Sequence, residues 1–194
     1  MVAPVEALAA IPDTLSDAEA VPLLCAGVTT FNALRHSALR RAALARCEAS
    51  AASATSESNL GISWATRLPR SAADLKIRRS QKSSEPAYID GKAVNAAEEL
   101  QKLGGAEAIL ATAPDSKAMS GLIDGLAPAG KFIVIGLSSD PIAVTPLQLI
   151  VGERAIQGSV TGTPTDSEDT LNFAELTGVR PMIETYPLEK AAEA

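Results

Sequence analysis

The chain has 194 residues, 46% of them hydrophobic, which is enough apolar material for one domain with a buried core. Its net charge of −6 and its single Trp argue against nucleic-acid binding. Two Cys, with no signal-peptide pattern and no apolar run of membrane-spanning length, predict a cytoplasmic protein without a membrane partner.

The first predicted element is a capped helix. Ser16 and Glu19 fit the S-x-x-E pattern, in which the serine hydroxyl caps the helix and the glutamate reaches back to the serine amide. Ala20, Leu23, Leu24 and Val28 supply an apolar face at helical spacing. The helical pattern is interrupted near residues 26–27 and then continues to His36. Helix is therefore predicted from Ser16 to His36, within a linker and helical part that covers residues 1–37.

Residues 38–86 differ in composition from the rest of the chain. They hold 11 Ala, 9 Ser and seven of the ten Arg, but one of the 13 Gly. Nine Lys or Arg stand against four Asp or Glu, so the segment is basic in an acidic chain. Because this low-complexity run has no periodic apolar pattern, we expect it to be disordered or irregular. The alternative interpretations are a genuine basic linker and a weak nucleic-acid-binding arm.

A shifted reading frame accounts for this composition. When the codon boundaries move by one base, Ala codons permit Gly, TCN Ser codons permit Ile, Val or Leu, and Thr codons permit His. Residues 47–60 can then read V-R-G-I-G-G-L-G-H-L-G-I-Q-F, which is typical of a dinucleotide-binding loop, and residues 64–72 can read as a buried strand. We therefore interpret residues 38–86 as a frame error or aberrant splicing, which sequencing the transcript across codons 37–88 tests.

Regular patterns return after residue 87. Strands are predicted at residues 88–90, 108–111, 132–135, 155–160 and 182–186. Helices are predicted at residues 94–103 and 115–128, after Thr145 and Pro146, at 165–178 with a capping box of Thr165 and Glu168, and from residue 188. This alternation predicts an α/β fold with an incomplete doubly wound parallel sheet, a partial Rossmann domain, over residues 87–194. The strand at 155–160 gives a weak indication of homo-oligomers.

Three of the predicted strand ends carry small or hydroxyl residues, at positions 112–114, 135–139 and 159–163. Ligands of open parallel sheets bind beyond the carboxyl ends of the strands, and small residues let a flat ligand approach the backbone closely. Each run on its own also fits a simple turn. Three such runs in one sheet favour a bound cofactor.

Two further residues are candidates for chemistry, Cys25 and His36. Zinc needs three or four protein ligands, and apart from carboxylates the chain offers these two residues and Cys47. From the residues alone, Cys25 is predicted to be a buried, small apolar residue. His36 ends a helix and is predicted to be non-catalytic. No catalytic residue is assigned.

Several stretches together resemble the zinc-dependent medium-chain alcohol dehydrogenases, and a fungal member in particular. The first runs from Ile11 to Thr29 and contains the fairly specific sequence PLLCAGVT at residues 22–29. Residues 109–114, 126–136, 158–169 and 177–181 are similar to the cofactor domain of the same family. The resemblance covers residues 1–37 and 88–194.

The resemblance implies hydride transfer between an alcohol or aldehyde and NAD or NADP, with a zinc ion that polarises the alcohol oxygen. It implies that Cys25 takes the place of the third catalytic zinc ligand, and that Thr29 lies beside the nicotinamide. Residues 1–37 then form the junction between the catalytic and cofactor domains. Contacts to the nicotinamide half of the cofactor are implied for Thr112, Ala113, Ile135, Gly136, Leu137, Ser159, Val160 and Thr161.

Three departures from the family pattern shape the functional expectation. The other zinc ligands would precede residue 1, the glycine loop falls in the shifted segment, and the final helix and strand would follow Ala194. Without the glycine loop the pyrophosphate site is lost. We therefore expect a truncated fragment that neither retains zinc nor turns over alcohol. The alternative hypotheses are a non-catalytic half-Rossmann protein that binds a partner or nucleotide weakly, and a helical hairpin joined by a basic linker to an α/β module.

Overall fold

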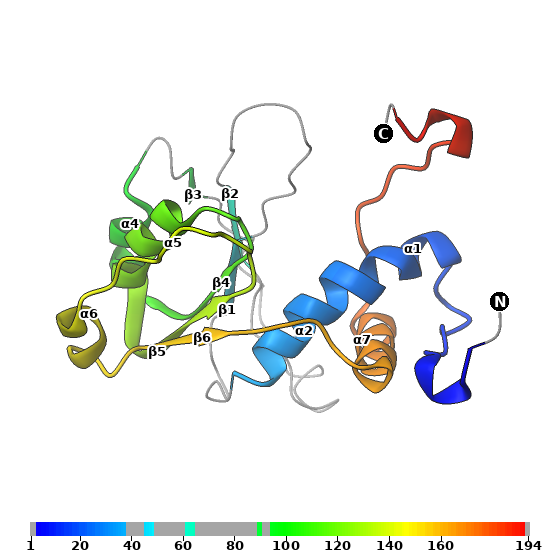
Figure 1. Cartoon of the computed structure of the whole chain (residues 1–194), viewed down its shortest axis with the longest axis horizontal. Helices are drawn as coiled ribbons and strands as arrows, with labels where there is room; N and C mark the ends of the chain where they lie inside the picture. Colours follow the sequence, from blue (N-terminus) through cyan, green and yellow to red (C-terminus); the bar gives the residue numbers. More distant parts are fainter. Residues whose placement is uncertain (1–2, 38–44, 49–60, 65–88, 91–93, 193–194) are drawn as a thin grey trace, which may run out of the picture. The chain divides into compact units, whose positions relative to one another are not determined.

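The structure, a computed structural model, describes residues 3–37, 45–48, 61–64, 89–90 and 94–192 (Figure 1). The chain divides into two compact units. Unit 1 comprises Met1–Asn32 and Thr161–Ala194, and unit 2 comprises Ala33–Val160. Within the described ranges, no helix combines the length and the apolar character that a membrane crossing requires.

Unit 2 is built on a six-stranded sheet in the order β3-β2-β1-β4-β5-β6. The strands are β1 (Ala45–Glu48), β2 (Gly61–Trp64), β3 (Ile89–Asp90), β4 (Ala106–Ala111), β5 (Leu126–Val134) and β6 (Ala155–Gly158). Strands β1, β4, β5 and β6 pair in parallel, whereas β2 is antiparallel to both β1 and β3. The predicted α/β fold with a parallel sheet is confirmed.

Strands β1 and β2 lie within residues 38–86, which the sequence predicts to be irregular. In β1, the backbone from Ala45 to Glu48 pairs in register with Ala108 to Ala111 of β4. Strand pairing uses backbone amides and carbonyls, so it can occur where the side-chain pattern gives no signal. The remainder of residues 38–86, including most of the expected glycine loop, lies outside the described residues.

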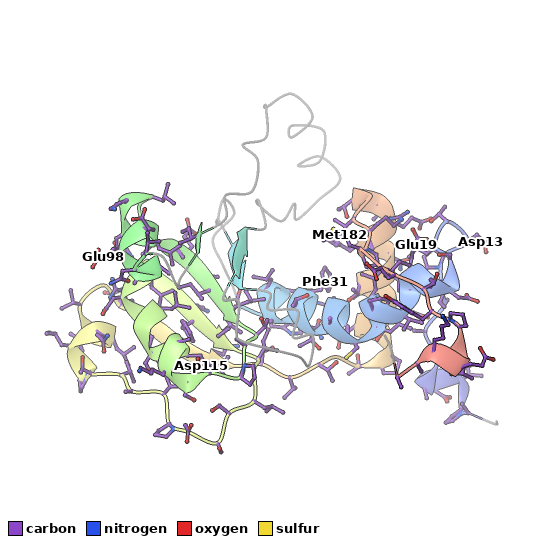
Figure 2. The ribbon with its side chains drawn as sticks, turned by 90° about the horizontal axis from the view of Figure 1, so that it is seen from above. Asp13, Glu19, Phe31, Glu98, Asp115 and Met182 are labelled. Carbon is purple, nitrogen blue, oxygen red and sulfur yellow. The ribbon has the colours of Figure 1, made fainter. Side chains whose placement is uncertain are left out.

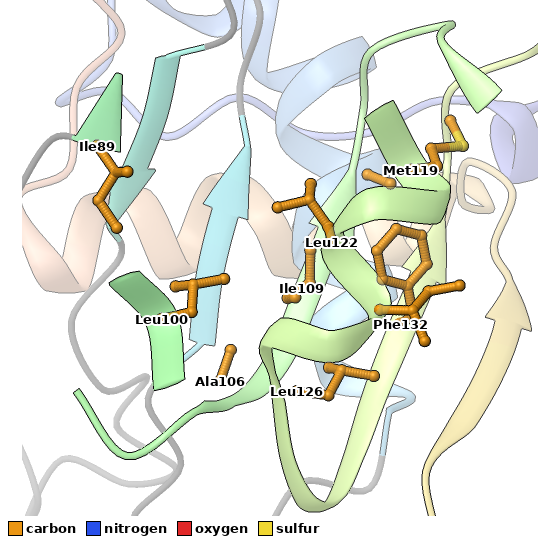
Figure 3. Close-up of a cluster of buried hydrophobic side chains, with 10 residues drawn as sticks. Ile89, Leu100, Ala106, Ile109, Met119, Leu122, Leu126 and Phe132 are labelled. Atoms are coloured by element: carbon orange, nitrogen blue, oxygen red, sulfur yellow. The ribbon is translucent and has the colours of Figure 1, made fainter. Parts of the chain in front are cut away.

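One face of the sheet packs against two helices, α4 (Ala96–Lys102) and α5 (Ser116–Leu122). Ile109 of β4 and Phe132 of β5 contribute to this core, together with Leu100 of α4 and with Met119 and Leu122 of α5 (Figure 3). Phe132 is fully buried. Burial of such side chains removes apolar surface from water, which is the main force that holds the sheet and helices together.

The opposite face of the sheet is covered as well. Leu110 and Ile133, the next residues along β4 and β5, point to this side because successive side chains of a strand alternate between faces. They pack with Ala33 and Leu34, which lie near the end of α2 (Val28–Arg35). The continuous apolar run at residues 132–135, predicted as a strand, therefore lies in a strand that is covered on both faces.

The helix predicted at residues 115–128 ends earlier than its spacing suggests. Helix α5 stops at Leu122, and a short 3-10 turn, η3 (Ile123–Gly125), leads directly into β5. Leu126 is buried, but it belongs to the strand and not to the predicted helix. Ala129 has a φ of 58°, and the register between β4 and β5 shifts at this point, so β5 begins with a bulge. A bulge tolerates Pro128, which has no amide hydrogen to donate.

Two other helices of unit 2 begin or end as the sequence predicts. Gly104 and Gly105 follow α4 with φ angles of 90° and 78°, which glycine adopts without strain. Thr145 caps α6 (Pro146–Ile150), and its hydroxyl accepts a hydrogen bond from the amide of Gln148. Proline at the first helical position costs no hydrogen bond there.

Unit 1 is helical. Its elements are η1 (Val5–Ala7), α1 (Asp17–Pro22), the π-type turn η2 (Leu23–Gly27), the first part of α2, α7 (Pro164–Thr177) and η4 (Leu188–Lys190). Ser16 and Glu19 form the predicted capping box. The core of the unit contains Leu15, Ala20 and Leu23 packed against Leu171 and Ala174 of α7.

Two predictions about unit 1 are wrong. Helix α7 is capped by Thr163, whose partner is Asp166, because Pro164 suits the first helical position and holds the preceding residue extended. Residues 182–186 form no strand, and Met182 is fully exposed. A segment becomes a strand only where a neighbouring strand offers a hydrogen-bonding edge.

Candidate functional site

The carboxyl ends of β4, β5 and β6 lie side by side. Ala111 of β4 is paired with Val134 of β5, and Val134 is paired with Gly158 of β6. The residues that follow these positions therefore leave the sheet along one edge. Unit 2 brings together most of the residues that the sequence analysis singled out, namely Thr112, Ala113, Ile135, Gly136, Leu137, Ser159 and Val160.

A close backbone approach fixes the first two strand ends against each other. The amides of Ile135 and Gly136 both donate to the carbonyl of Ala111, at 2.9 and 2.8 Å. A Cβ atom on Gly136 would lie 2.4 Å from the carbonyl oxygen of Ala113 and 2.7 Å from that of Thr112. No real Cβ comes so near, so this approach requires glycine.

Two large apolar side chains are exposed to solvent at this edge. Leu137 is 90% exposed and Val160 is 81% exposed. The amide of Ser159 donates to Val134 at 2.9 Å, so this amide, like those of Ile135 and Gly136, is engaged within the sheet. What the edge offers a ligand is therefore side-chain surface, the apolar kind that a flat ring can cover.

A cavity of about 570 Å³ adjoins these strand ends. It lies between the start of α5 and the chain after β5, and Pro114, Asp115, Ser116, Lys117, Ser120, Ser138, Asp140, Pro141 and Ala143 line it. Asp115, labelled in Figure 2, caps α5 by accepting from the amides of Lys117 and Ala118. The sequence indicated Asp115 and Ser116 as a helix start, but gave no signal for the cavity.

Unit 1 contains the remaining candidates, Cys25, Thr29 and Thr161. The Thr29 hydroxyl donates to the carbonyl of Cys25 at 2.7 Å. Thr161 is exposed and precedes Gly162, which packs against Val28 and Asn32 of α2. Cys25 is exposed, so the prediction of a buried apolar residue is wrong. Its apolar neighbours suggest burial, but Cys25 falls on the outer side of the turn η2, whereas Leu23 points inward.

Zinc does not fit the described residues. Zinc requires three or four protein ligands, and Cys25 supplies one. Among the residues that the structure describes, no three His, Cys, Asp or Glu side chains gather closely enough to hold a metal ion. His36, at the end of α2, is exposed.

Two described side chains with a shifted pKa, Glu19 and Lys102, lie in the end turns of helices. The pKa of Glu19 is lowered by hydrogen bonds from the hydroxyl and the amide of Ser16, and to a smaller extent by the attraction of Arg180. The pKa of Lys102 is raised by its bond to Glu99 in the last turn of α4. Both arrangements stabilise helices.

Known proteins resemble this chain over most of its length. Residues 83–176 match the family described as zinc-binding dehydrogenase. An alcohol dehydrogenase of Penicillium expansum, patD, is 34% identical, over 97% of this chain and 56% of the relative. An alcohol dehydrogenase of Geobacillus stearothermophilus is 28% identical, over 98% of this chain and 57% of the relative. The chain thus spans little more than half the length of these relatives.

Solved structures share the fold. The alcohol dehydrogenase of Aeropyrum pernix has a TM-score of 0.66 at 15% identity, with 94% of this chain and 56% of that chain covered. A cinnamyl alcohol dehydrogenase of Sorghum bicolor has a TM-score of 0.62 at 18% identity, with 95% and 53% covered. At these identities the likeness concerns the fold alone.

Proposed function

We propose that this chain belongs to the zinc-dependent medium-chain alcohol dehydrogenase family and that the carboxyl edge of β4, β5 and β6 binds the nicotinamide half of NAD or NADP. The reaction in which such a cofactor serves is hydride transfer between an alcohol or aldehyde and the nicotinamide ring. The proposal is carried by the exposure of Leu137 and Val160 at adjacent strand ends, within the stretch that matches the family.

The residues at the edge are proposed to make different kinds of contact with the cofactor. Leu137 and Val160 offer apolar surface that would exclude water from the ring. Thr112 and Ser159 are half-buried and bring hydroxyl groups, which suit the carboxamide of the ring. Gly136 allows the chain after β5 to approach the backbone of Thr112 and Ala113 after β4. Thr29 and Thr161 stay cofactor contacts predicted from the sequence.

Binding without turnover is the second candidate function. Cys25 is exposed and has no ligand cluster around it in the described part of the chain. We therefore expect the purified chain to give no NAD(P)H signal with primary alcohols, with or without added zinc. A signal that disappears in Cys25→Ser would contradict this expectation.

Cofactor binding is tested with two matched pairs of substitutions. Val160→Asp places a charge at the carboxyl end of β6, whereas Val151→Asp places it before the amino end of the same strand, at a valine that is 61% exposed. Leu137→Asp and Leu147→Asp form the second pair, with 90% and 68% exposure. Because all four side chains are exposed, none of these changes removes core packing.

The measurement is saturation-transfer NMR with NADH and NADPH on the full chain. We expect the nicotinamide protons to receive more saturation than the adenine protons. This signal should fall at least about tenfold in Val160→Asp and Leu137→Asp, because a charged group loses its hydration against an apolar ring, and persist in the two controls. Equal binding by all four variants would refute the proposed site.

Two expectations from the sequence stay predictions. A cytoplasmic location is tested by imaging the tagged chain in cells. Self-association is tested by sedimentation at several concentrations, where a mass that grows with concentration indicates homo-oligomers.

A further inference from the structure

The chain after β5 is tied to helix α5 by two serine side chains. The segment in question, residues 137–144, is named the β5 loop. The Ser116 hydroxyl donates to the carbonyl oxygen of Asp140 at 2.6 Å. The amide of Ala143 donates to the Ser120 hydroxyl at 2.9 Å. These two bonds join the loop to neighbouring turns of α5.

Both serine hydroxyls are positioned to form hydrogen bonds with the backbone of the β5 loop. Ser116 is 5% exposed, so its hydroxyl has left water for the protein interior. A serine inside a helix commonly bonds the carbonyl four residues earlier. Ser120 does this, donating to Ser116 at 2.7 Å, and uses its remaining acceptor capacity for the loop amide. One hydroxyl thus connects the helix backbone with the loop backbone.

Polar bonds are needed here because packing alone does not fix the loop. Ser138 and Pro141 line the cavity of about 570 Å³, so part of this stretch borders open space. Ile142 and Val144 are partly buried against the core. Gly136 holds the start of the loop against β4. Between these anchors, the serine bonds set the position of the backbone.

We infer that Ser116 and Ser120 are positioning residues for the cofactor edge. They hold the β5 loop, which begins with the exposed Leu137 just after the carboxyl end of β5. The inference rests on the proposed function, because the edge matters only if it binds nicotinamide. Neither serine is among the residues proposed to contact the cofactor.

The test uses the full chain and four substitutions, at Ser120, Ser116 and Ser139. Ser120→Ala removes the acceptor of the Ala143 amide, and Ser120→Thr keeps the hydroxyl. Ser139→Ala, at an exposed loop serine, is the control. Ser116→Ala removes the bond to the carbonyl of Asp140 and serves as the alternative if Ser120→Ala does not fold. Amide hydrogen exchange at Ala143 reports the loop, and NADH saturation transfer reports binding.

Loss of the bond should speed exchange at Ala143 about fivefold, the effect of one typical net hydrogen bond. NADH affinity should fall about three- to tenfold, and the ratio of nicotinamide to adenine signals should drop. Ser120→Thr should restore both readouts, and Ser139→Ala should change neither. Unchanged exchange in both alanine variants, or faster exchange with unchanged NADH signals, overturns the inference. If the unsubstituted chain binds neither NADH nor NADPH, the proposed function fails, and the inference with it.

Discussion

The glycine that joins the first two strand ends gives the sharpest test of the cofactor edge. Gly136→Ala adds a single methyl group, the smallest change that the position can receive. The new Cβ would lie 2.4 Å from the carbonyl oxygen of Ala113 and 2.7 Å from that of Thr112. Both neighbours are backbone atoms, which cannot rotate away as a side chain can. Gly158→Ala, in β6, is the matched control, because its Cβ would meet nothing within 4 Å.

The size of the effect follows from this geometry. An ordinary contact of a Cβ atom is 3.4 Å or longer, so the backbone after β4 or β5 must move by about an ångström. Overpacking of this kind costs about 1–3 kcal/mol. In the control, alanine in place of glycine removes freedom from the unfolded chain and should stabilise by about 0.5–1 kcal/mol. The two substitutions are therefore expected to act with opposite signs.

The assay is urea unfolding, followed through amide NMR signals of β4, β5 and β6 so that unit 2 is monitored by itself. Gly136→Ala should lower the midpoint and Gly158→Ala should leave it unchanged or raise it, with equal slopes. NADH binding should weaken in the first variant and persist in the second. Equal midpoints for the two variants would show that the close approach at Gly136 does not constrain the strand ends.

Two further substitutions test the core and the helix cap. Phe132→Ala removes a fully buried ring and should lower the unfolding free energy of unit 2 by about 3–5 kcal/mol in the same assay, whereas Leu137→Ala, at an exposed position, should change it by less than about 0.5 kcal/mol. Ser16→Ala removes the hydrogen bond from the Ser16 hydroxyl, the largest cause of the lowered pKa of Glu19, so this pKa should rise toward its ordinary 4.5. A pKa that is lower in the folded state stabilises the protein at pH values above the pKa of the unfolded chain, and this stabilisation is lost as the pH falls. The variant should therefore lose less stability on acidification. NMR titration of the Glu19 carboxyl carbon measures the pKa.

The sequence predicts unit 2 well where local signals agree with tertiary packing. The run at Phe132 and Ile133 identifies a strand covered on both faces because apolar side chains are needed on each. Helix starts at Asp115 and Thr145 are recognisable because their side chains bond nearby amides. The strand ends are predictable for the same reason, since residues after parallel strands share one edge.

Other features escape the sequence because distant residues decide them. The bulge before β5 depends on pairing with β4, which no local pattern at Pro128 reveals. The exposure of Cys25 depends on which side of the turn η2 it occupies. The cavity depends on two serines of α5 that bond to a loop some twenty residues later. Such contacts are set by the whole packed fold, so they become visible only in three dimensions.

The widened turn η2 has a consequence for how this helix can change in length. Each residue of an α-helix rotates the chain by about 100°, and a π-type turn accommodates one residue more than an α turn. Ala20 before the turn and Val28 and Asn32 after it are all buried. In a regular α-helix, the loss of Ala26 would leave Val28 and Asn32 seven and eleven positions after Ala20, each about 20° from its direction. Deleting Ala26 would therefore remove the widened turn and keep all three side chains on the buried face. This helix can lose one residue at the turn itself without exposing the side chains that it now buries.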